Sequence, residues 1–457
     1  MANSQWCDPA PEGNEFMTKL MATGDSMITR GLMHSTDPRW LEIVDLLHGG
    51  DAAFTNFEMG TPRDPIVPNV NHPSAFQYAK PFVIDELKAA GFNVIGAGNN
   101  HVADYGPRGL LDLLDELEAR NLPVFGAGPS LGEARRPAYQ DTPGGRIAWL
   151  GTTSTNVEHS MAVARRPDMD GRPGVNPLRF SLEYYLEPRL YDALVEIDEA
   201  LGTAAVFRHR AQFAALMGHS NPDAHTFLGA SFFRGEPSRV VSRPNKGDMA
   251  ALEKAIAAAR RQADLVAVSL HAHEGPAGDL NSETPADFIV EAAHRAIDAG
   301  ADIVVGHGPH MLRGIEVYKG KPIYLSLGSF VFEIETLQRQ PAPAYEKHGL
   351  PFDALPVDVT DEVGSVRSGP QPNGFWDNRF WTSVIAETTF DGRELKEIKL
   401  HPIDLQMEAE RWVRGAPLMA DATTGRWVLE GLQELSPGVE ITIEDAGERV
   451  VGSVRLS

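Results

Sequence analysis

The sequence predicts an α/β protein in which helices pack on the faces of a sheet. Short apolar segments alternate with amphipathic helical patterns, and two antiparallel strand pairs follow near the end of the chain. The chain has 457 residues, of which 42% are hydrophobic, enough for one large domain with insertions or for two ordinary domains. We therefore expect a mixed sheet, or a sandwich with outer helices, around a sizeable core.

The first third of the chain predicts a β-α-β-α-β-α-β order. Short apolar segments predict strands at 17–22, 52–55, 93–95 and 147–150. Apolar residues at helical spacing predict helices at 41–47, 82–90 and 108–120. This order favours parallel strands joined by helical crossovers.

The same rhythm returns later, with strands expected at 265–269 and 303–305 and helices at 248–262 and 285–299. After Gly314, two strands are expected on either side of a tight turn at Lys319–Gly320. A second pair is expected at 380–389 and 397–400, with Asp391–Gly392 at the turn.

Between 156 and 246 the rhythm lapses, which predicts an inserted loop or cap; a second irregular stretch runs from 338 to 378. We expect residues 1–155 and 247–410 to form the two halves of one domain, with 411–457 as a C-terminal extension packing on it. The insertion is rich in arginine. It is either a solvated loop or a lid that grips a carboxylate or phosphate through one of four side chains: Arg165, Arg166, Arg172 and Arg179.

Charge and cysteine content exclude several classes of function. The formal net charge is -22, so binding to nucleic acid or to an anionic membrane is not expected. Cys7 is the single cysteine, which rules out an internal disulfide and a thiolate metal site. No signal-peptide pattern or membrane-spanning stretch is apparent, so we expect a cytoplasmic protein that acts on a small or oligomeric anionic substrate. A homo-oligomer remains open.

Polar residues of ligand type follow the apolar strand segments. Because ligands gather at the carboxyl ends of strands in open α/β sheets, these residues are expected to converge. The set comprises Asp25, Glu58, Asn100, His101, Asp104, His271, His307 and His310. Carboxylate, amide and imidazole ligands suit one or two divalent transition-metal ions such as Mn, Zn, Fe or Co. Such ions activate water, which predicts hydrolysis.

These motifs resemble the CapA family, associated with capsule and poly-γ-glutamate biosynthesis and similar to calcineurin-like metallophosphoesterases. The strongest match is GHGPH at 306–310, followed by GIEVYKGKPIY at 314–324 and SLGSF at 326–330. The resemblance covers about 17–155 and 248–405. It implies a four-layer α/β/β/α sandwich with an inserted cap.

The resemblance also implies a role for each residue. Asp25 and His310 would bind one metal ion and Glu58 would bridge two. Asn100, His271 and His307 would complete the second site. His101 would act as general acid or hydrogen-bond donor, and Asp104 would orient it or serve as a turn residue.

Two departures from the phosphoesterase pattern leave alternatives open: a histidine ligand is missing, and the closing histidines, His307 and His310, are spaced His-x-x-His rather than His-x-His. Met27 stands where a histidine ligand is expected, so His273 is a candidate replacement and a single-metal site is an alternative. Glu274, beside it, is a ligand or a residue that supports one. The substrate is a phosphoester or a glutamate-derived amide. The rival functions are a non-catalytic accessory role in polyglutamate assembly or export and a small-molecule lyase.

Overall fold

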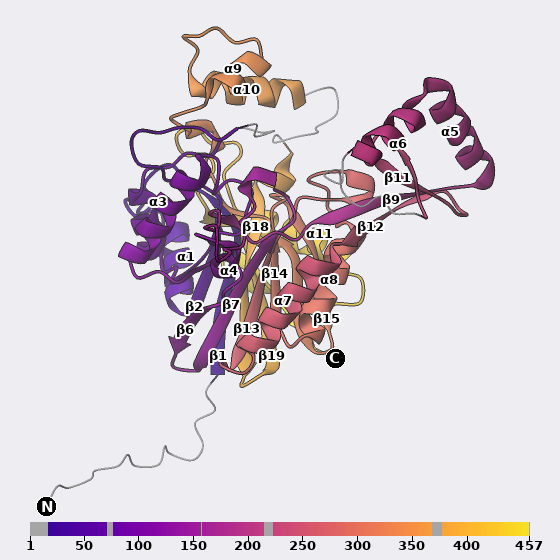
Figure 1. Cartoon of the computed structure of the whole chain (residues 1–457). Helices are drawn as coiled ribbons and strands as arrows, with labels where there is room; N and C mark the ends of the chain where they lie inside the picture. The colour runs from indigo at the N-terminus through magenta and orange to yellow at the C-terminus, as the bar shows by residue number, and fades with distance from the viewer. Residues whose placement is uncertain (1–16, 71–75, 157, 214–222, 368–376, 457) are drawn as a thin grey trace, which may run out of the picture.

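Two large β-sheets and the helices around them form the body of the protein (Figure 1). The computed structural model describes residues 17–70, 76–156, 158–213, 223–367 and 377–456. Within them the architecture is mixed α/β, as the sequence predicts. No helix in these ranges is long and apolar enough to cross a membrane.

The first sheet has the order β21-β22-β19-β18-β1-β2-β3-β4, with β17 also pairing with β1 and β20 with β19. Its strands are β1 (Met17–Met27), β2 (Ala52–Phe57), β3 (Val94–Gly96), β4 (Val124–Phe125), β17 (Ser329–Phe332), β18 (Thr382–Asp391), β19 (Glu394–Asp404), β20 (Leu418–Met419), β21 (Glu440–Ala446) and β22 (Arg449–Arg455). β1 to β4 run parallel and β18 to β22 antiparallel to their neighbours. The C-terminal strands therefore extend this sheet.

The second sheet has the order β15-β16-β14-β13-β7-β6. Its strands are β6 (Ala138–Thr142), β7 (Gly145–Thr153), β13 (Leu265–His271), β14 (Ile303–His307), β15 (Leu312–Tyr318) and β16 (Lys321–Leu327). β7, β13, β14 and β16 run parallel, so their carboxyl ends lie at one edge. The expected turn at Lys319–Gly320 joins β15 to β16.

Three apolar clusters hold these layers together. One joins the first sheet to helices α1 (Pro38–His48), α2 (Phe82–Ala90) and α3 (Gly106–Ala119). A second contains side chains of both sheets and of α11 (Ala422–Leu435), and a third joins the second sheet to α7 (Lys246–Ala259) and α8 (Asp287–Asp298). Figure 1 shows α1 and α3 on one side of the strands and α7 and α8 on the other.

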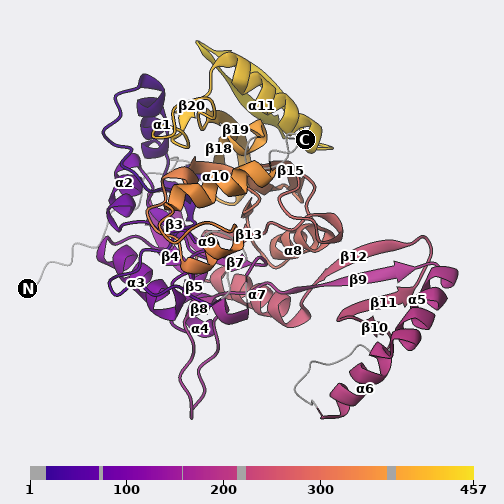
Figure 2. The same ribbon diagram turned by 90° about the horizontal axis from the view of Figure 1, so that it is seen from above.

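The two stretches expected to be irregular contain regular elements. Between 338 and 378 lie α9 (Ala342–Lys347) and α10 (Pro356–Arg367). The segment from 156 to 246 is not a structureless loop. A sheet of order β10-β11-β9-β12 projects from the body with two helices (Figure 2). Its elements are β9 (Phe180–Leu186), α5 (Pro188–Leu201), α6 (Thr203–Phe213), β10 (His225–Phe227), β11 (Ala230–Arg234) and β12 (Arg239–Pro244).

The remaining short elements lie in the loops between these strands. β5 (Ala127–Gly128) pairs with β8 (Gly174–Val175), next to α4 (Leu131–Ala134). The described part of the chain also has four 3-10 turns, at Glu158–Ser160, Pro276–Gly278, Ile334–Thr336 and Asn378–Phe380. The turn at 276–278 lies beside β12, so the base of the projecting sheet contacts the loop that follows β13.

Candidate metal centre

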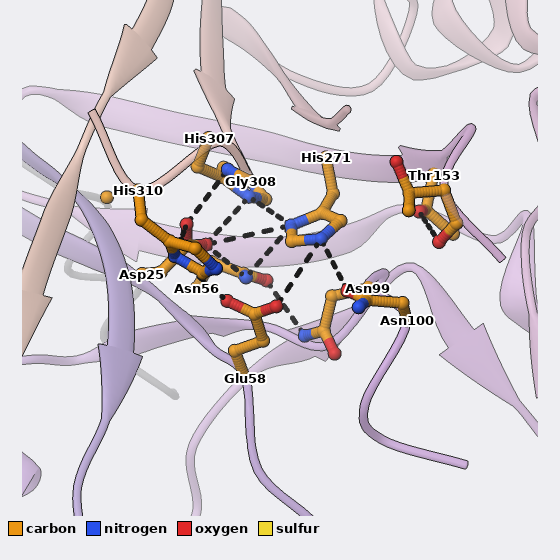
Figure 3. Close-up of polar contacts among 12 residues, drawn as sticks. Asp25, Asn56, Glu58, Asn99, Asn100, Thr153, His271, His307, Gly308 and His310 are labelled. Atoms are coloured by element: carbon orange, nitrogen blue, oxygen red, sulfur yellow. Dashed lines mark hydrogen bonds and ion pairs between the residues drawn. The ribbon is translucent and has the colours of Figure 1, made fainter. Parts of the chain in front are cut away.

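The ligand-type side chains come from the carboxyl ends of strands in both sheets. Asp25 lies within β1, where the register with β2 and β17 shifts. His271 and His307 are the last residues of β13 and β14 and pair across them. The strands run further than the sequence predicts, so these residues belong to the strands and do not follow them. Figure 3 shows the side chains pointing toward one another.

Asp25 is surrounded by hydrogen-bond donors and imidazoles. Its Oδ1 accepts a hydrogen bond from Asn56 Nδ2 at 2.7 Å, and its Oδ2 accepts one from the backbone N–H of Gly308 at 2.8 Å. His307 Nδ1 lies 3.3 Å from Oδ1 and His310 Nδ1 lies 3.4 Å from Oδ2. The side chain is 0% exposed, so these contacts replace its water shell.

The turn between β14 and β15 brings both imidazoles to Asp25 despite their His-x-x-His spacing. Gly308 has φ +121°, and a Cβ there would lie 2.9 Å from the backbone nitrogen of Ala272. His310 has φ +58°, a conformation uncommon for a residue other than glycine. Strained backbone of this kind clusters at functional sites, where surrounding contacts hold it in place.

Glu58 is a buried carboxylate that lacks hydrogen bonds. Both oxygens are buried, and neither has a hydrogen-bond partner among the described residues. Oε1 lies 3.6 Å from His271 Nε2 and 3.9 Å from His273 Nε2, and Oε2 lies 3.8 Å from His310 Nδ1. Because an uncompensated buried carboxylate is costly, this arrangement fits a bound cation.

His271 stands at the centre of the cluster. Its Nδ1 lies 3.0 Å from His307 Nδ1, and its Nε2 lies 3.1 Å from His273 Nε2 and 2.7 Å from Asn100 Oδ1. A neutral imidazole has one N–H, so it cannot donate to neighbours at both nitrogens. Several of these nitrogen and oxygen atoms therefore direct lone pairs toward the same space, as the ligands of a metal ion do.

Burial and neighbouring groups shift the pKa values of Asp25 and Glu58 in opposite directions. Burial acts to raise the pKa of Asp25, but hydrogen bonds from the three histidines hold it well below its usual value. Burial, together with the charges of Asp25 and Asp104, raises the pKa of Glu58 well above its usual value. Burial lowers the pKa of His271 to about 4, so this ring is neutral and able to bind a metal at neutral pH.

His101 and Asp104 form a buried pair at the edge of the cluster. His101 Nδ1 lies 2.8 Å from Asp104 Oδ2, which also accepts a hydrogen bond from the backbone N–H of Gln77 at 2.7 Å. His101 Nε2 faces the cluster, 3.8 Å from Glu58 Oε1. Burial, with the nearby charge of His310, lowers the pKa of His101 to about 3. Asp104 therefore orients a neutral imidazole whose second nitrogen is directed at the site.

The segment after β13 contributes His273 and its support. His273 Nδ1 lies 2.8 Å from Asn281 Oδ1, which leaves Nε2 facing Glu58. Glu274 accepts hydrogen bonds from Ser154 at 2.6 Å and Thr155 at 2.9 Å, so in this structure it supports the segment. Met27, where a histidine was expected, is 2% exposed and packs in the core.

The four arginines of the insertion bind partners outside this cluster. Arg179 forms two hydrogen bonds to Asp248, at 2.8 and 2.9 Å, and Arg172 donates to the backbone carbonyl oxygen of Met161. Arg166 contacts Asp168, and Arg165 lies 3.7 Å from Asp170. Their role in gripping a substrate stays a prediction.

Among the residues that the structure describes, three groups of side chains could each hold a metal ion. Within each group the candidate ligand atoms lie within 4.8 Å of one another, and every residue is buried. The groups are Asp25, His271 and His307; Glu58, His271 and His273; and Asp25, Glu58 and His310. Carboxylate and imidazole donors of this kind fit a borderline divalent ion. Shared residues link the groups, so the cluster has the donor set for one ion or two.

Several supporting residues were not singled out as site residues from the sequence. Asn56 holds Asp25, Asn99 donates to Asn56 Oδ1 at 3.1 Å, and Ser269 Oγ lies 2.6 Å from His307 Nε2. Asn99 is next to Asn100 and Asn56 lies two residues before Glu58, and this closeness in sequence is the signal that could have identified them. Arg313 is fully buried and donates to the backbone carbonyls of Ala272, His273 and Glu274, and nothing in its sequence context predicts this contact.

Fold and cluster together define a mixed α/β protein with a candidate metal centre at the carboxyl ends of its parallel strands. The chain belongs to the family described as Bacterial capsule synthesis protein PGA_cap, whose model matches residues 19–334. The predicted resemblance to CapA is therefore confirmed.

Relatives match most of the chain. It is 31% identical to Uncharacterized protein y4uA of Sinorhizobium fredii, over 96% of this chain and 93% of that protein. It is 27% identical to Capsule biosynthesis protein CapA of Bacillus anthracis, over 82% of this chain and 74% of that protein. It is also 27% identical to PGA biosynthesis protein CapA of Bacillus subtilis, over 60% and 52% respectively.

Proposed function

We propose that this protein is a metal-dependent hydrolase. The observation that carries the proposal is Glu58, whose two buried oxygens lack hydrogen bonds and face imidazole nitrogens of His271, His273 and His310. A buried carboxylate without hydrogen bonds destabilises the fold unless a positive charge compensates it. A bound metal ion would supply that compensation.

The described side chains of the site would have two roles: most would bind the metal, and one would transfer a proton. Six would hold one or two divalent ions: Asp25, Glu58, Asn100, His271, His307 and His310, with His273 as a further ligand. The bound ion would acidify water and polarise the bond under attack. His101, oriented by Asp104 through Nδ1, would accept a proton at Nε2 from the attacking water and then donate it from Nε2 to the leaving group.

We infer that the two sheets and their covering helices form the four-layer α/β/β/α arrangement of calcineurin-like phosphoesterases. The three apolar clusters support this inference, since one lies between the sheets and the others lie beneath helices. The substrate would be anionic, a phosphoester or a γ-glutamyl amide. A cytoplasmic location stays a prediction from the sequence.

Product analysis of the metal-reconstituted chain tests the proposal. Phosphoesters and γ-glutamyl peptides are incubated in ¹⁸O-labelled water with Mn²⁺, Zn²⁺, Co²⁺ or Fe²⁺. Hydrolysis incorporates one labelled oxygen into the product, and Asp104→Asn reduces the rate. A matched control is His294→Ala, since His294 pairs with Glu316 at 2.8 Å away from the cluster. Product formed without labelled oxygen would identify a lyase and contradict the proposal.

The names of the relatives favour a second candidate, a non-catalytic accessory of polyglutamate synthesis. A Mycobacterium tuberculosis relative is named Probable polyglutamine synthesis accessory protein, and two Bacillus relatives are named for capsule or PGA biosynthesis. This candidate predicts that a His307→Ala variant loses metal but still binds poly-γ-glutamate. Calorimetric titration of the polymer into wild type and variant distinguishes the two.

A further inference from the structure

The projecting sheet and its helices bury almost no apolar side chain of their own. We call β9 to β12 with α5 and α6 the wing. In the described residues 180–209 and 223–244, the buried ones are Asp198, Ala204, Ser242 and Pro244. None of the three large apolar clusters includes a fully buried residue from these ranges. Two layers of secondary structure normally cover a core between them, so a further surface is expected to pack on the wing.

Helix α5 carries an apolar face that is largely exposed. The α5 stripe comprises six side chains: Leu190, Ala193, Leu194, Ile197, Ala200 and Leu201. At 3.6 residues per turn they span an arc of about 120°. Leu190 is 40% exposed, Ile197 50% and Leu201 64%. The arc that contacts the sheet is different, because Asp198 is buried there and lies 2.8 Å from His225 of β10.

Charged residues of α5 lie outside the stripe. Asp192, Glu196 and Glu199 are exposed, and helical spacing places them on the side opposite to it. Small alanines, at 193 and 200, flank the four large side chains on the open edge and allow close approach of another helix. A helix that only faced water would be expected to carry charges at these flanking positions.

The stripe is complementary to itself. Its large residues occur at 190, 194, 197 and 201, and the spacing of 4, 3 and 4 reads the same in both directions. Two antiparallel copies would place Leu190 opposite the second copy's Leu201, and Leu194 opposite the second copy's Ile197. Facing pairs of large apolar residues at this spacing are typical of an antiparallel coiled coil. Because both copies use the same surface, the contact would form a closed dimer with two-fold symmetry.

We propose that the α5 stripe is a homodimer interface, in which α5 packs antiparallel against α5 of a second copy. The position of α5 at the outer margin of the wing, away from the body in both views, leaves room for the partner (Figures 1 and 2). Val206 and Phe207 of α6, the helix that follows α5, are also 51% and 37% exposed. Helix α5 is about 21 Å long, so the contact is modest and the dimer dissociates on dilution.

Sedimentation velocity of the full chain across micromolar concentrations tests the proposal. Wild type sediments as a dimer that dissociates on dilution. Ile197→Glu and Leu201→Glu raise the dissociation constant at least tenfold, whereas Leu355→Glu, at a residue 62% exposed outside the wing, leaves it unchanged. Unchanged circular dichroism shows that the variants fold. A monomeric wild type, or a dimer that Ile197→Glu does not weaken, overturns the proposal.

Cross-linking tests the orientation. In a Cys7→Ser background, Leu190→Cys and Leu201→Cys variants are mixed and oxidised. The antiparallel pair predicts disulfides between the two variants and none within either variant alone. Disulfides that form within each variant alone indicate parallel helices and overturn the register.

Discussion

Replacing Glu58 by glutamine is expected to stabilise the metal-free protein while removing its response to metal. Burial and the neighbouring carboxylates raise the pKa of Glu58, so at neutral pH the metal-free protein must take up a proton or hold a buried charge. The unfolded chain has neither the cost of protonation nor the cost of a buried charge. A glutamine at this position avoids both costs in the folded protein. Because the folded pKa is raised above the unfolded one, the cost appears above pH 4.5 and grows as pH rises.

The size of this effect follows from linkage. Protonating a carboxyl group with an unfolded pKa of 4.5 costs about 1.4 kcal/mol per pH unit, which limits the penalty to about 3 kcal/mol at pH 7. We expect Glu58→Gln to gain about 1–3 kcal/mol in the free energy of unfolding at pH 7 and much less at pH 5. At a metal concentration 100 times the dissociation constant, wild type gains about 2.7 kcal/mol. The variant gains almost nothing.

Urea unfolding of chelator-treated protein, with and without added Zn²⁺ or Mn²⁺, measures both effects. Glu333→Gln is the matched control, because Glu333 is also buried but accepts hydrogen bonds from Thr29 and from Arg30. That substitution is expected to destabilise the protein. If Glu58→Gln lowers stability without metal and still responds to metal, Glu58 is a structural residue and the reasoning fails.

Three further substitutions test other parts of the structure. Asp104→Asn, which disturbs the orientation of His101, is expected to lower kcat about 100-fold with unchanged metal content by elemental analysis. Ser269→Ala removes the partner of His307 Nε2 and is expected to weaken metal binding about 10- to 100-fold in competition titrations. Hydrogen bonds from His401 and Lys19 lower the pKa of Glu387 to about 2, so Glu387→Gln is expected to cost about 2 kcal/mol at pH 7 in urea unfolding. That cost should disappear as pH falls from 4.5 toward 2, and a pH-independent cost would contradict the pairing.

Much of the body could be predicted from the sequence because its pattern is regular there. Helix α2 has the predicted bounds, since Gly91 ends it in a left-handed conformation. The sequence predicted an insertion at 156–246 but not the strands of the wing within it, because both faces of the wing's sheet are partly exposed. In β9, Phe180 to Leu186 are half-buried or exposed without alternation, so no period of two marks the strand.

The sequence predicted that the site residues lie close together, because they occur at or near strand ends. It did not predict the detailed geometry of the site. The unusual φ of His310 and the shifted register at Asp25 depend on contacts between strands distant in sequence. The same holds for Arg313, whose carbonyl partners lie about 40 residues earlier. Sequence spacing carries no information about such contacts.

Elemental analysis of protein purified without chelator tests the central claim most directly. Wild type is expected to contain one or two transition-metal ions per chain, and His271→Ala and His307→Ala are expected to lose them, since both rings face Asp25. The His294→Ala control should retain the wild-type content. Wild-type protein that binds no ion after reconstitution with Mn²⁺, Zn²⁺, Co²⁺ or Fe²⁺ would contradict the account.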